Sequence, residues 1–310
     1  MSQGAIYIIT QDPRYVGLLL ASAASLKRVM PELPITVFSQ FPVESPLFET
    51  IVRVERTQDG FFDKTRLMRE SPYDRTLFID ADIHVAEPFS ELFTLLDRFD
   101  CAATHEEYVS TDWSQRYPRP DIPESFPEFN TGILMLKRSE KVDRLLAEWG
   151  DLYRAFLEAK PGQQINDQPF FRVAAYYSDV RIATLTREYN CKFRGQGYLN
   201  GKVKVLHGHI NFEMQPSQIK AAEITLNKSL KPRVYIAGEV YEQKLVGRLV
   251  SRRTAHKVGS FPELPGSILV HRARRMKKIV EERGLKGTLA KIFRVGPNKC
   301  PDPPRKDSSC

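Results

Sequence analysis

The sequence lacks long hydrophobic runs and has few cysteines. Its longest apolar stretch, Val16 to Leu26, contains Ser22 and Ser25 and is shorter than the roughly 20 residues that cross a bilayer. Met1 to Thr10 lacks a basic segment followed by an apolar one, so we expect no secretory signal and a cytoplasmic location. The 4 cysteines lie far apart, without a CxxC pair, and give no spacing typical of a zinc site.

Excess positive charge is also absent from most of the chain, although its net charge is +8. Residues 242–310 contain 17 Lys or Arg against 6 Asp or Glu, an excess of 11, which leaves residues 1–241 at −3. This shift predicts a catalytic domain at 1–241 and a basic helical extension with a disordered tail at 242–310. Because the extension lacks regularly spaced aromatics for base stacking, we do not expect nucleic acid as a partner.

Part of this extension has the pattern of an amphipathic helix. Between Ser267 and Arg294 an apolar line runs beside basic residues. The apolar line consists of Leu269, Ala273, Met276 and Val280. Two interpretations stay open: a helix lying on an anionic membrane surface, and a solvated basic helix packed on the catalytic domain.

Short apolar runs alternate with helical patterns in the first two thirds of the chain. The runs that suit buried strands are Ala5 to Ile9, Ile35 to Phe38, Thr76 to Ile79, Ile133 to Leu136 and Val203 to Leu206. Helical spacing follows Asp12 and Pro13, which suit an N-cap and a first turn, and recurs from Val142 to Phe156. This alternation predicts an α/β domain with a mostly parallel sheet, whose ligands bind beyond the carboxyl ends of the strands. The long proline-containing loop at 105–128 is expected to be either functional or disordered.

The most informative segment is TLFIDADIHV, Thr76 to Val85, in which a buried strand ends in two carboxylates. Asp80 and Asp82 are separated by the small residue Ala81, and side chains two apart in an extended chain point the same way. Such a pair can hold a hard divalent cation, which can neutralise a diphosphate leaving group. For an isolated DxD, turn-forming acids that only end a strand would be the commoner interpretation.

Three later segments also place polar residues next to apolar runs. Asn130 precedes a strand in EFNTGILML, Asp167 and Gln168 begin a helix in NDQPFF, and His207 follows a strand in VKVLHGH. Each has a structural interpretation: Asn130 as a turn residue, Asp167 as a helix cap, and His207 as a hydrogen-bonded core histidine.

Together, in this order, these segments resemble the GT-A nucleotide-sugar transferases, especially glycosyltransferase family eight, which includes glycogenin and bacterial lipopolysaccharide galactosyltransferases. The resemblance covers roughly residues 5–210 and includes DKTRLMRESPYDRTLFIDAD, FNTGILMLKRS, DQPFFR and LHG. It implies a GT-A fold, a nucleotide-sugar donor such as a UDP-sugar, and Mn²⁺ or Mg²⁺ as cofactor. The acceptor, whether a sugar, a lipid-linked sugar or a protein, is not implied.

The resemblance also implies roles for individual residues. Asp80, Asp82 and His207 would bind the metal, with His209 a poorer match. Asn130 and Asp167 would hold the donor sugar, and Gln168 would lie close to the anomeric carbon of a retaining enzyme. The donor would further contact Lys64, with Arg66 as second candidate, and Ala81, and its nucleoside would contact Thr10, Gln11 and Tyr15. The chain departs from the family in having no Lys-Pro-Trp after its His207-Gly208-His209.

Other functions fit the sequence less well. A haloacid-dehalogenase phosphatase needs Thr or Val two residues after its second Asp, where this chain has His84. A nucleotidyltransferase would need a glycine-rich loop after the first strand, and Thr10 to Tyr15 contains no glycine. The alternative from another class is a non-catalytic carbohydrate-binding or nucleotide-binding module with the same fold.

Overall fold

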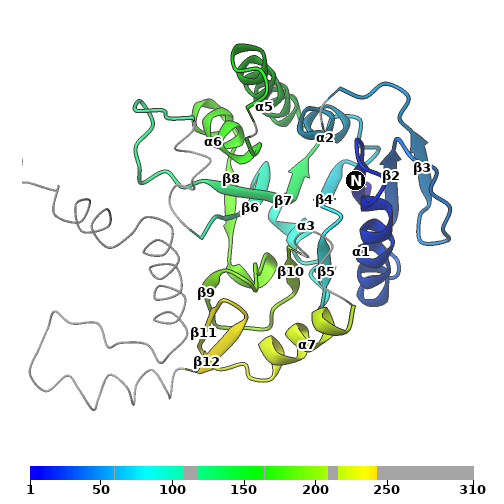
Figure 1. Cartoon of the computed structure of the whole chain (residues 1–310), viewed down its shortest axis with the longest axis vertical. Helices are drawn as coiled ribbons and strands as arrows, with labels where there is room; N and C mark the ends of the chain where they lie inside the picture. The colour runs from blue at the N-terminus through cyan, green and yellow to red at the C-terminus, as the bar shows by residue number, and fades with distance from the viewer. Residues whose placement is uncertain (59, 108–116, 164, 209–215, 243–310) are drawn as a thin grey trace, which may run out of the picture. The chain divides into compact units, whose positions relative to one another are not determined.

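A computed structural model describes residues 1–58, 60–107, 117–163, 165–208 and 216–242. Its central sheet has 7 strands in the order β3-β2-β1-β4-β7-β6-β8 (Figure 1). Their bounds are β1 Gln3–Ile9, β2 Ile35–Ser39, β3 Thr50–Arg53, β4 Arg75–Ile79, β6 Cys101–His105, β7 Phe129–Lys137 and β8 Ile182–Leu185. All of these strands run in one direction except β7, which is antiparallel to both β4 and β6. The predicted α/β fold with a mostly parallel sheet is therefore confirmed.

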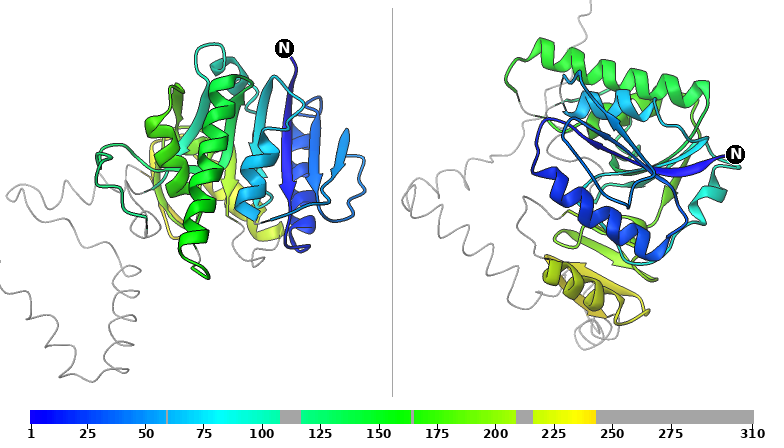
Figure 2. Two further views of the ribbon diagram at one scale, coloured as in Figure 1. Left: turned by 90° about the horizontal axis from the view of Figure 1, so that it is seen from above. Right: turned by 90° about the vertical axis from the view of Figure 1, so that its right-hand side faces the viewer.

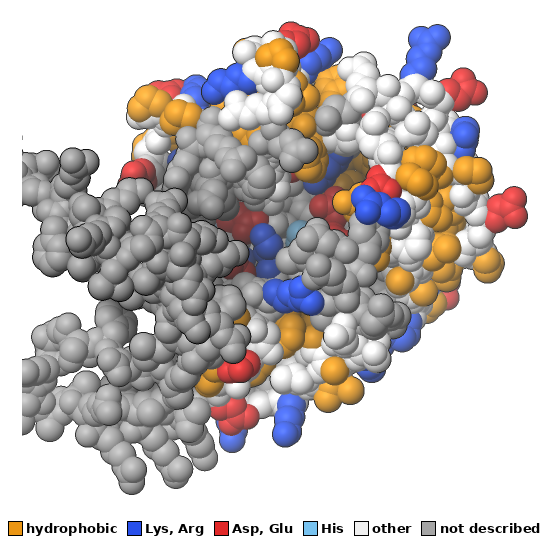
Figure 3. Space-filling model, in the orientation of Figure 1, with side chains coloured by type: hydrophobic (Ala, Val, Ile, Leu, Met, Phe, Trp, Pro, Cys, Tyr) orange, Lys and Arg blue, Asp and Glu red, His pale blue; other side chains and the backbone are white. Residues whose placement is uncertain are grey.

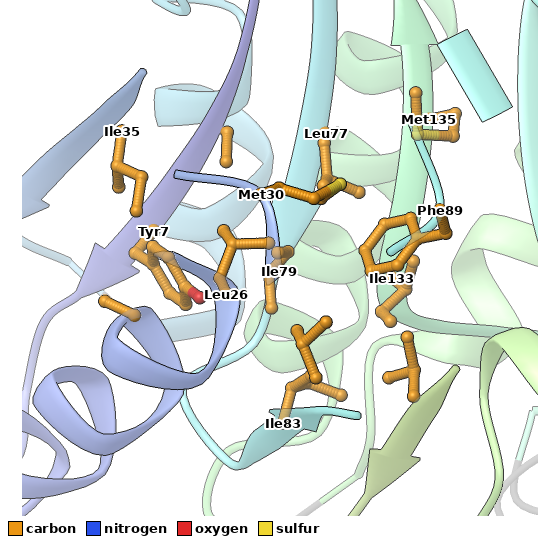
Figure 4. Close-up of a cluster of buried hydrophobic side chains, with 14 of the residues drawn as sticks. Tyr7, Leu26, Met30, Ile35, Leu77, Ile79, Ile83, Phe89, Ile133 and Met135 are labelled. Carbon is orange, nitrogen blue, oxygen red and sulfur yellow. The ribbon is translucent and has the colours of Figure 1, made fainter. Parts of the chain in front are cut away.

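The two faces of the sheet are covered by different helices (Figure 2). Alternate side chains of the strands point to opposite faces, which divides the core into two large clusters. On one face, α1 (Tyr15–Val29) contributes Leu26 and Met30 follows it, and both pack near Tyr7 and Leu77 (Figure 4). On the other face lie α2 (Gly60–Met68), α5 (Glu140–Ala159) and α6 (Gln168–Tyr177). Both faces of the sheet are therefore buried, as the apolar strand sequences require.

Several smaller elements complete the fold outside the central sheet. β5 (Ile83–Val85) pairs antiparallel with β10 (Val205–His207). A three-stranded sheet contains β9 (Gln196–Leu199), β11 (Arg233–Ile236) and β12 (Glu239–Glu242). The remaining elements are α3 (Leu92–Leu95), the 3-10 helix η1 (Arg187–Tyr189) and α7 (Pro216–Asn227). Among the described helices, none combines the length and apolar content that crossing a bilayer requires.

The structure confirms Ile133 to Leu136 as a buried strand, within the antiparallel β7. Of the run Val203 to Leu206, Val205 and Leu206 belong to a strand, β10, which lies outside the central sheet. The expected helix cap is wrong. Helix α1 begins at Tyr15 without a side-chain cap, because the Asp12 carboxylate instead accepts the backbone N–H of Arg14 at 2.9 Å and pairs with its guanidinium. The extension at 243–310 lies outside the described residues, so the boundary at 241/242 stays a prediction.

Candidate metal centre

The two aspartates of the DxD segment lie on a short turn between β4 and β5. The backbone N–H of Asp80 still donates to Gly132 in β7 (2.8 Å), and the carbonyl of Asp82 accepts the N–H of Gly208 (3.2 Å). Backbone bonds on both sides therefore hold the turn, with the small Ala81 buried between the carboxylates. This fixes both acidic side chains at the carboxyl edge of β4, where the sequence predicts a ligand.

His207 reaches the same place from β10. Because β10 pairs with β5, with His207 opposite Ile83, its imidazole lies beside the two aspartates. Ligand atoms of Asp80, Asp82 and His207 all lie within 4.8 Å of one another, and Nε2 of His207 is 3.5 Å from Oδ1 of Asp82. The structure thus brings together the three residues predicted as metal ligands, while His209 lies outside the described residues.

Burial sets the electrostatics of this cluster. It lowers the pKa of His207 to about 4, although the nearby Asp80 carboxylate acts in the opposite direction. At neutral pH the imidazole is therefore uncharged and has a lone pair on one nitrogen. Burial also raises the pKa of Asp80, and Asp82 acts in the same direction, whereas the ammonium of Lys64 opposes the increase. A cation between the carboxylates would relieve this repulsion.

Lys64 of α2 is a buried cation next to the aspartates. Its Nζ lies 3.5 Å from Asp80 and 3.2 Å from Asp167, and it donates to Thr131 at 3.2 Å. Burial acts to lower its pKa, but the charges of Asp167 and Asp80 raise it above the usual value, so Lys64 is charged. Its ammonium also lies 5.0 Å from the ring of Phe78. One buried amine thus connects the DxD turn to α6.

Asp167 occupies the N-cap position of α6, but its side chain makes no capping hydrogen bond. Its carboxylate instead accepts the hydroxyl of Thr131 at 3.2 Å and pairs with Lys64. Its backbone carbonyl accepts the indole N–H of Trp149 at 3.0 Å, and the side chain of Asn166 accepts the N–H of Gln168 at 3.1 Å. The interpretation of Asp167 as a helix cap therefore does not account for its carboxylate.

Asn130 lies inside β7 and not at a turn, where its structural interpretation would place it. It is 2% exposed, and its amide nitrogen donates to Glu106 (2.6 Å) and to Gln168 (3.0 Å). Gln168 in turn donates to Glu128 at 3.0 Å. Because β7 is antiparallel, its first residues lie at the carboxyl edge of the other strands, and this is how Asn130 reaches the metal centre.

Sequence reasoning missed three polar residues of this site. Glu106 follows β6, Asn190 follows η1, and Lys192 pairs with Glu106 at 3.1 Å. Burial acts to raise the pKa of Glu106, but the charge of Lys192 and the hydrogen bond from Asn130 lower it below its usual value. Glu106 and Glu128 lie near the two ends of the long loop at 105–128, for which a functional role was one of two expectations, whereas nothing in the local sequence marks Asn190.

The residues predicted to hold the nucleoside lie at the rim. Gln11 has a left-handed backbone (φ 69°), and its N–H donates to Gln40 at 2.9 Å. Thr10 and Gln11 both lie beside the start of α2 at Gly60, and Tyr15 is 40% exposed. Burial raises the pKa of Tyr15, and the charge of Asp82 raises it further, as expected for a phenol near the metal centre.

Arg66, the second candidate for donor contact, is held elsewhere. Its guanidinium pairs with Asp63 of α2 (3.5 Å) and with Glu70, which follows α2 (3.0 Å), and donates to a backbone carbonyl. Only Lys64 of the two candidates contacts the predicted ligands. Acidic, basic and histidine side chains gather in a hollow of the face seen in Figure 3.

No protein-family model matches the sequence, and no curated protein matches it significantly. Several solved structures do resemble the fold. A galactosyltransferase, LgtC, solved with donor and acceptor sugar analogues, matches with a TM-score of 0.46 and 13% identity over 67% of this chain and 87% of its own. Mouse xyloside xylosyltransferase 1 matches with a TM-score of 0.46 and 16% identity, over 69% of this chain and 100% of its own.

The glycosyltransferase GlyE of Streptococcus pneumoniae matches with a TM-score of 0.43 and 16% identity, over 62% of this chain and 47% of its own. All three are glycosyltransferases, the class that the sequence resemblance implies. At these identities and TM-scores the likeness carries no argument about activity. The function is therefore argued from the side chains of the site.

Proposed function

We propose that this chain is a metal-dependent glycosyltransferase, which transfers a sugar from a nucleotide-diphosphate donor, a UDP-sugar, to an acceptor hydroxyl. The observation that supports the proposal most is the convergence of Asp80, Asp82 and His207 beside the buried Lys64–Asp167 pair. Two carboxylates and a neutral imidazole form a donor set that suits a divalent transition metal better than an all-oxygen site would. The residues present therefore fit the cofactor that the resemblance implies.

The residues of the site would have different roles, which follow from their positions. Asp80, Asp82 and His207 would hold the cation, which when bound offsets the negative charge that develops on a leaving diphosphate. Asn130 makes four hydrogen bonds within the protein, one of them to Gln168, and would act on the donor sugar by holding Gln168, which would orient it. Asp167 is neutralised by Lys64. It is therefore suited to holding a sugar hydroxyl and poorly suited to removing a proton as a general base.

The first test is donor binding and turnover. Nucleotide-sugars should raise the unfolding temperature when Mn²⁺ is present, because a ligand that binds the folded state stabilises it. Transfer should stop in Asp80→Asn and Asp82→Asn with the fold retained, whereas Asp151→Asn, which removes an exposed carboxylate on α5, should leave it unchanged. Full transfer by chelator-treated protein would refute the metal-dependent reaction. Donor binding without transfer or donor hydrolysis would instead favour the non-catalytic module.

The choice of metal is a separate prediction. Mn²⁺ should serve at least as well as Mg²⁺, because imidazole suits transition metals, whereas Mg²⁺ prefers oxygen ligands and retains its waters. His207→Ala should weaken the Mn²⁺ dependence more than the stability of the fold. His209→Ala is the control, and loss of activity in that variant alone would move the third ligand to His209.

The stereochemistry can be tested independently. We propose retention of anomeric configuration, because Asp167 and Gln168 resemble the DQ pair of a retaining family and because the sequence shows no obvious general base. The anomeric proton coupling of the product, measured by NMR, distinguishes the outcomes. An inverted product would exclude family eight while leaving sugar transfer intact.

A further inference from the structure

We infer that Asn190 is a positioning residue that fixes the His207 imidazole in the tautomer whose Nε2 lone pair faces the two aspartates. The inference rests on the proposed metal centre, but it concerns only groups that this chain supplies. Asn190 follows η1, is 1% exposed, and lies between Asn130 and His207. One hydrogen-bond chain runs from Glu106 through Asn130 and Asn190 to His207.

The chain starts at Asn130, whose amide orientation is fixed from both sides. A backbone N–H can only donate, so the N–H of Gly132 at 3.0 Å requires the oxygen, Oδ1, on that side. On the other side Glu106, paired with Lys192, is a carboxylate that can only accept, so it requires the amide nitrogen, at 2.6 Å. Both neighbours demand the same orientation, and a flipped amide would lose both bonds.

Asn130 then determines the orientation of Asn190. The Oδ1 of Asn130 accepts a second hydrogen bond, from Nδ2 of Asn190 at 2.7 Å. With its nitrogen committed there, Asn190 presents its carbonyl oxygen to His207, whose Nδ1 lies 2.8 Å away. Two acceptors at that distance would repel, so Nδ1 of His207 must carry the proton.

A proton on Nδ1 determines the state of the other ring nitrogen, Nε2. A neutral imidazole with its proton on Nδ1 has a lone pair on Nε2, which here lies 3.5 Å from Oδ1 of Asp82. An unconstrained imidazole exchanges between both tautomers, and one of them would present an N–H to a cation. By excluding that form, Asn190 prepares the ligand before any metal arrives, which is the role that outer partners of metal-binding histidines generally have.

The test reads the tautomer directly in the metal-free full chain. The chain has only 6 histidines, so ¹⁵N-histidine NMR near neutral pH can resolve them, with His207→Gln identifying the signal. Wild-type His207 should show a pyrrole-type Nδ1 and a pyridine-type Nε2. Asn190→Ala should lose this pattern and weaken Mn²⁺ binding, measured by EPR, by roughly 10–100-fold.

Two further variants separate positioning from packing. Asn190→Asp still offers an oxygen to Nδ1–H and should retain the wild-type tautomer. Asn200→Ala removes an exposed asparagine of the same region and should change neither the NMR pattern nor Mn²⁺ affinity. A protonated Nε2 in the wild type, or an unchanged tautomer in Asn190→Ala, would overturn the inference. Because the NMR measurement needs neither donor nor turnover, absence of transfer activity would refute the proposed function alone.

Discussion

The ammonium of Lys64 is the residue-scale feature on which the buried charges of the site depend. Two acidic groups, Asp80 and Asp167, share this one buried amine. Removing the amine leaves the buried Asp167 and the partly exposed Asp80 without their counter-charge. We therefore expect Lys64→Met to lower the free energy of unfolding by about 3–5 kcal/mol and to abolish transfer. Chemical denaturation monitored by circular dichroism gives the first quantity.

Two further variants test whether the loss of stability comes from the buried charges. Arg66→Met removes a partly exposed cation of the same helix, whose ion pairs are worth about 0–1 kcal/mol, so its effect should be small. Adding Asp167→Asn to Lys64→Met should restore part of the lost stability, because one of the unpaired charges is then gone. Equal effects of Lys64→Met and Arg66→Met would contradict the buried-charge account.

Protonation of His207 makes a second prediction, on pH. Its pKa is about 4 in the fold against an ordinary value of 6.5, so the unfolded chain binds the proton more readily. The contribution of His207 is fully present above pH 6.5 and is lost as pH falls toward 4, a change of about 3 kcal/mol in the free energy of unfolding. The raised pKa of Asp80 acts in the opposite direction, so the measured quantity is the difference between wild type and His207→Gln, both without metal. Parallel stability profiles for the two proteins between pH 4 and 6.5 would show that His207 is not buried as a neutral group.

At the scale of elements, the antiparallel strand β7 determines which side chains lie next to one another at the site. Its Gly132 packs so close to His207 that an added Cβ would lie 2.4 Å from Cε1 and 2.9 Å from Nε2. We expect Gly132→Ala to displace the imidazole, to weaken Mn²⁺ binding by roughly 10–100-fold, and to cost about 1–3 kcal/mol of stability. Calorimetric Mn²⁺ titration and thermal denaturation measure the two effects.

Gly17→Ala is the matched control for that substitution. Gly17 lies in α1 with no atom within 4 Å of an added Cβ, so the alanine should leave metal affinity unchanged and raise stability by up to about 1 kcal/mol. Wild-type metal affinity in Gly132→Ala would mean that the imidazole does not occupy the position described here.

Elements of this kind also show what the sequence could predict. The strands β1, β2 and β4 are short apolar runs, and the helix α5 has apolar residues at helical spacing. The positions of these elements follow from those patterns. The direction of β7 does not, because a fully buried strand has the same apolar composition whichever way it runs. Asn130 was expected at the site because its segment resembles the family's motif. Its place inside a strand and its contact with Glu106 depend on the antiparallel direction of β7.

Across the whole molecule, the sequence could predict residues that belong to motifs and missed those that pair across long separations. Asp80 and Asp82 stood out by their spacing after a strand, and the family resemblance added His207 to them. Asn190 did not, because its role arises only when η1 meets β7 and β10 in space. Contacts between distant segments leave no periodic trace in the sequence, so they need a structure.

The concentration of positive charge in the extension at 242–310 supports the prediction that this segment binds anionic membranes. The basic extension should bring the full-length protein to anionic vesicles at low salt, since each Lys or Arg near such a surface contributes about 1 kcal/mol. Replacing Arg274, Arg275, Lys277 and Lys278 by Gln should reduce flotation with these vesicles. Neutral vesicles and high salt should abolish it.

A control variant keeps the loss of charge constant. It carries Gln at the exposed positions Arg144, Lys160, Lys202 and Lys231 of the catalytic region and should float as the wild type does. If the full chain ignores anionic vesicles at low salt, the extension is better interpreted as a solvated basic helix.

The pairing of β5 with β10 has a consequence for how the protein matures. The DxD turn is synthesised early, but its imidazole partner belongs to a strand that leaves the ribosome only after most of the domain has been made. A nascent chain that ends before β10 therefore has both aspartates of the proposed metal site and not its histidine. The proposed metal would be captured tightly only once the catalytic region is nearly complete, so its loading would come late in biosynthesis.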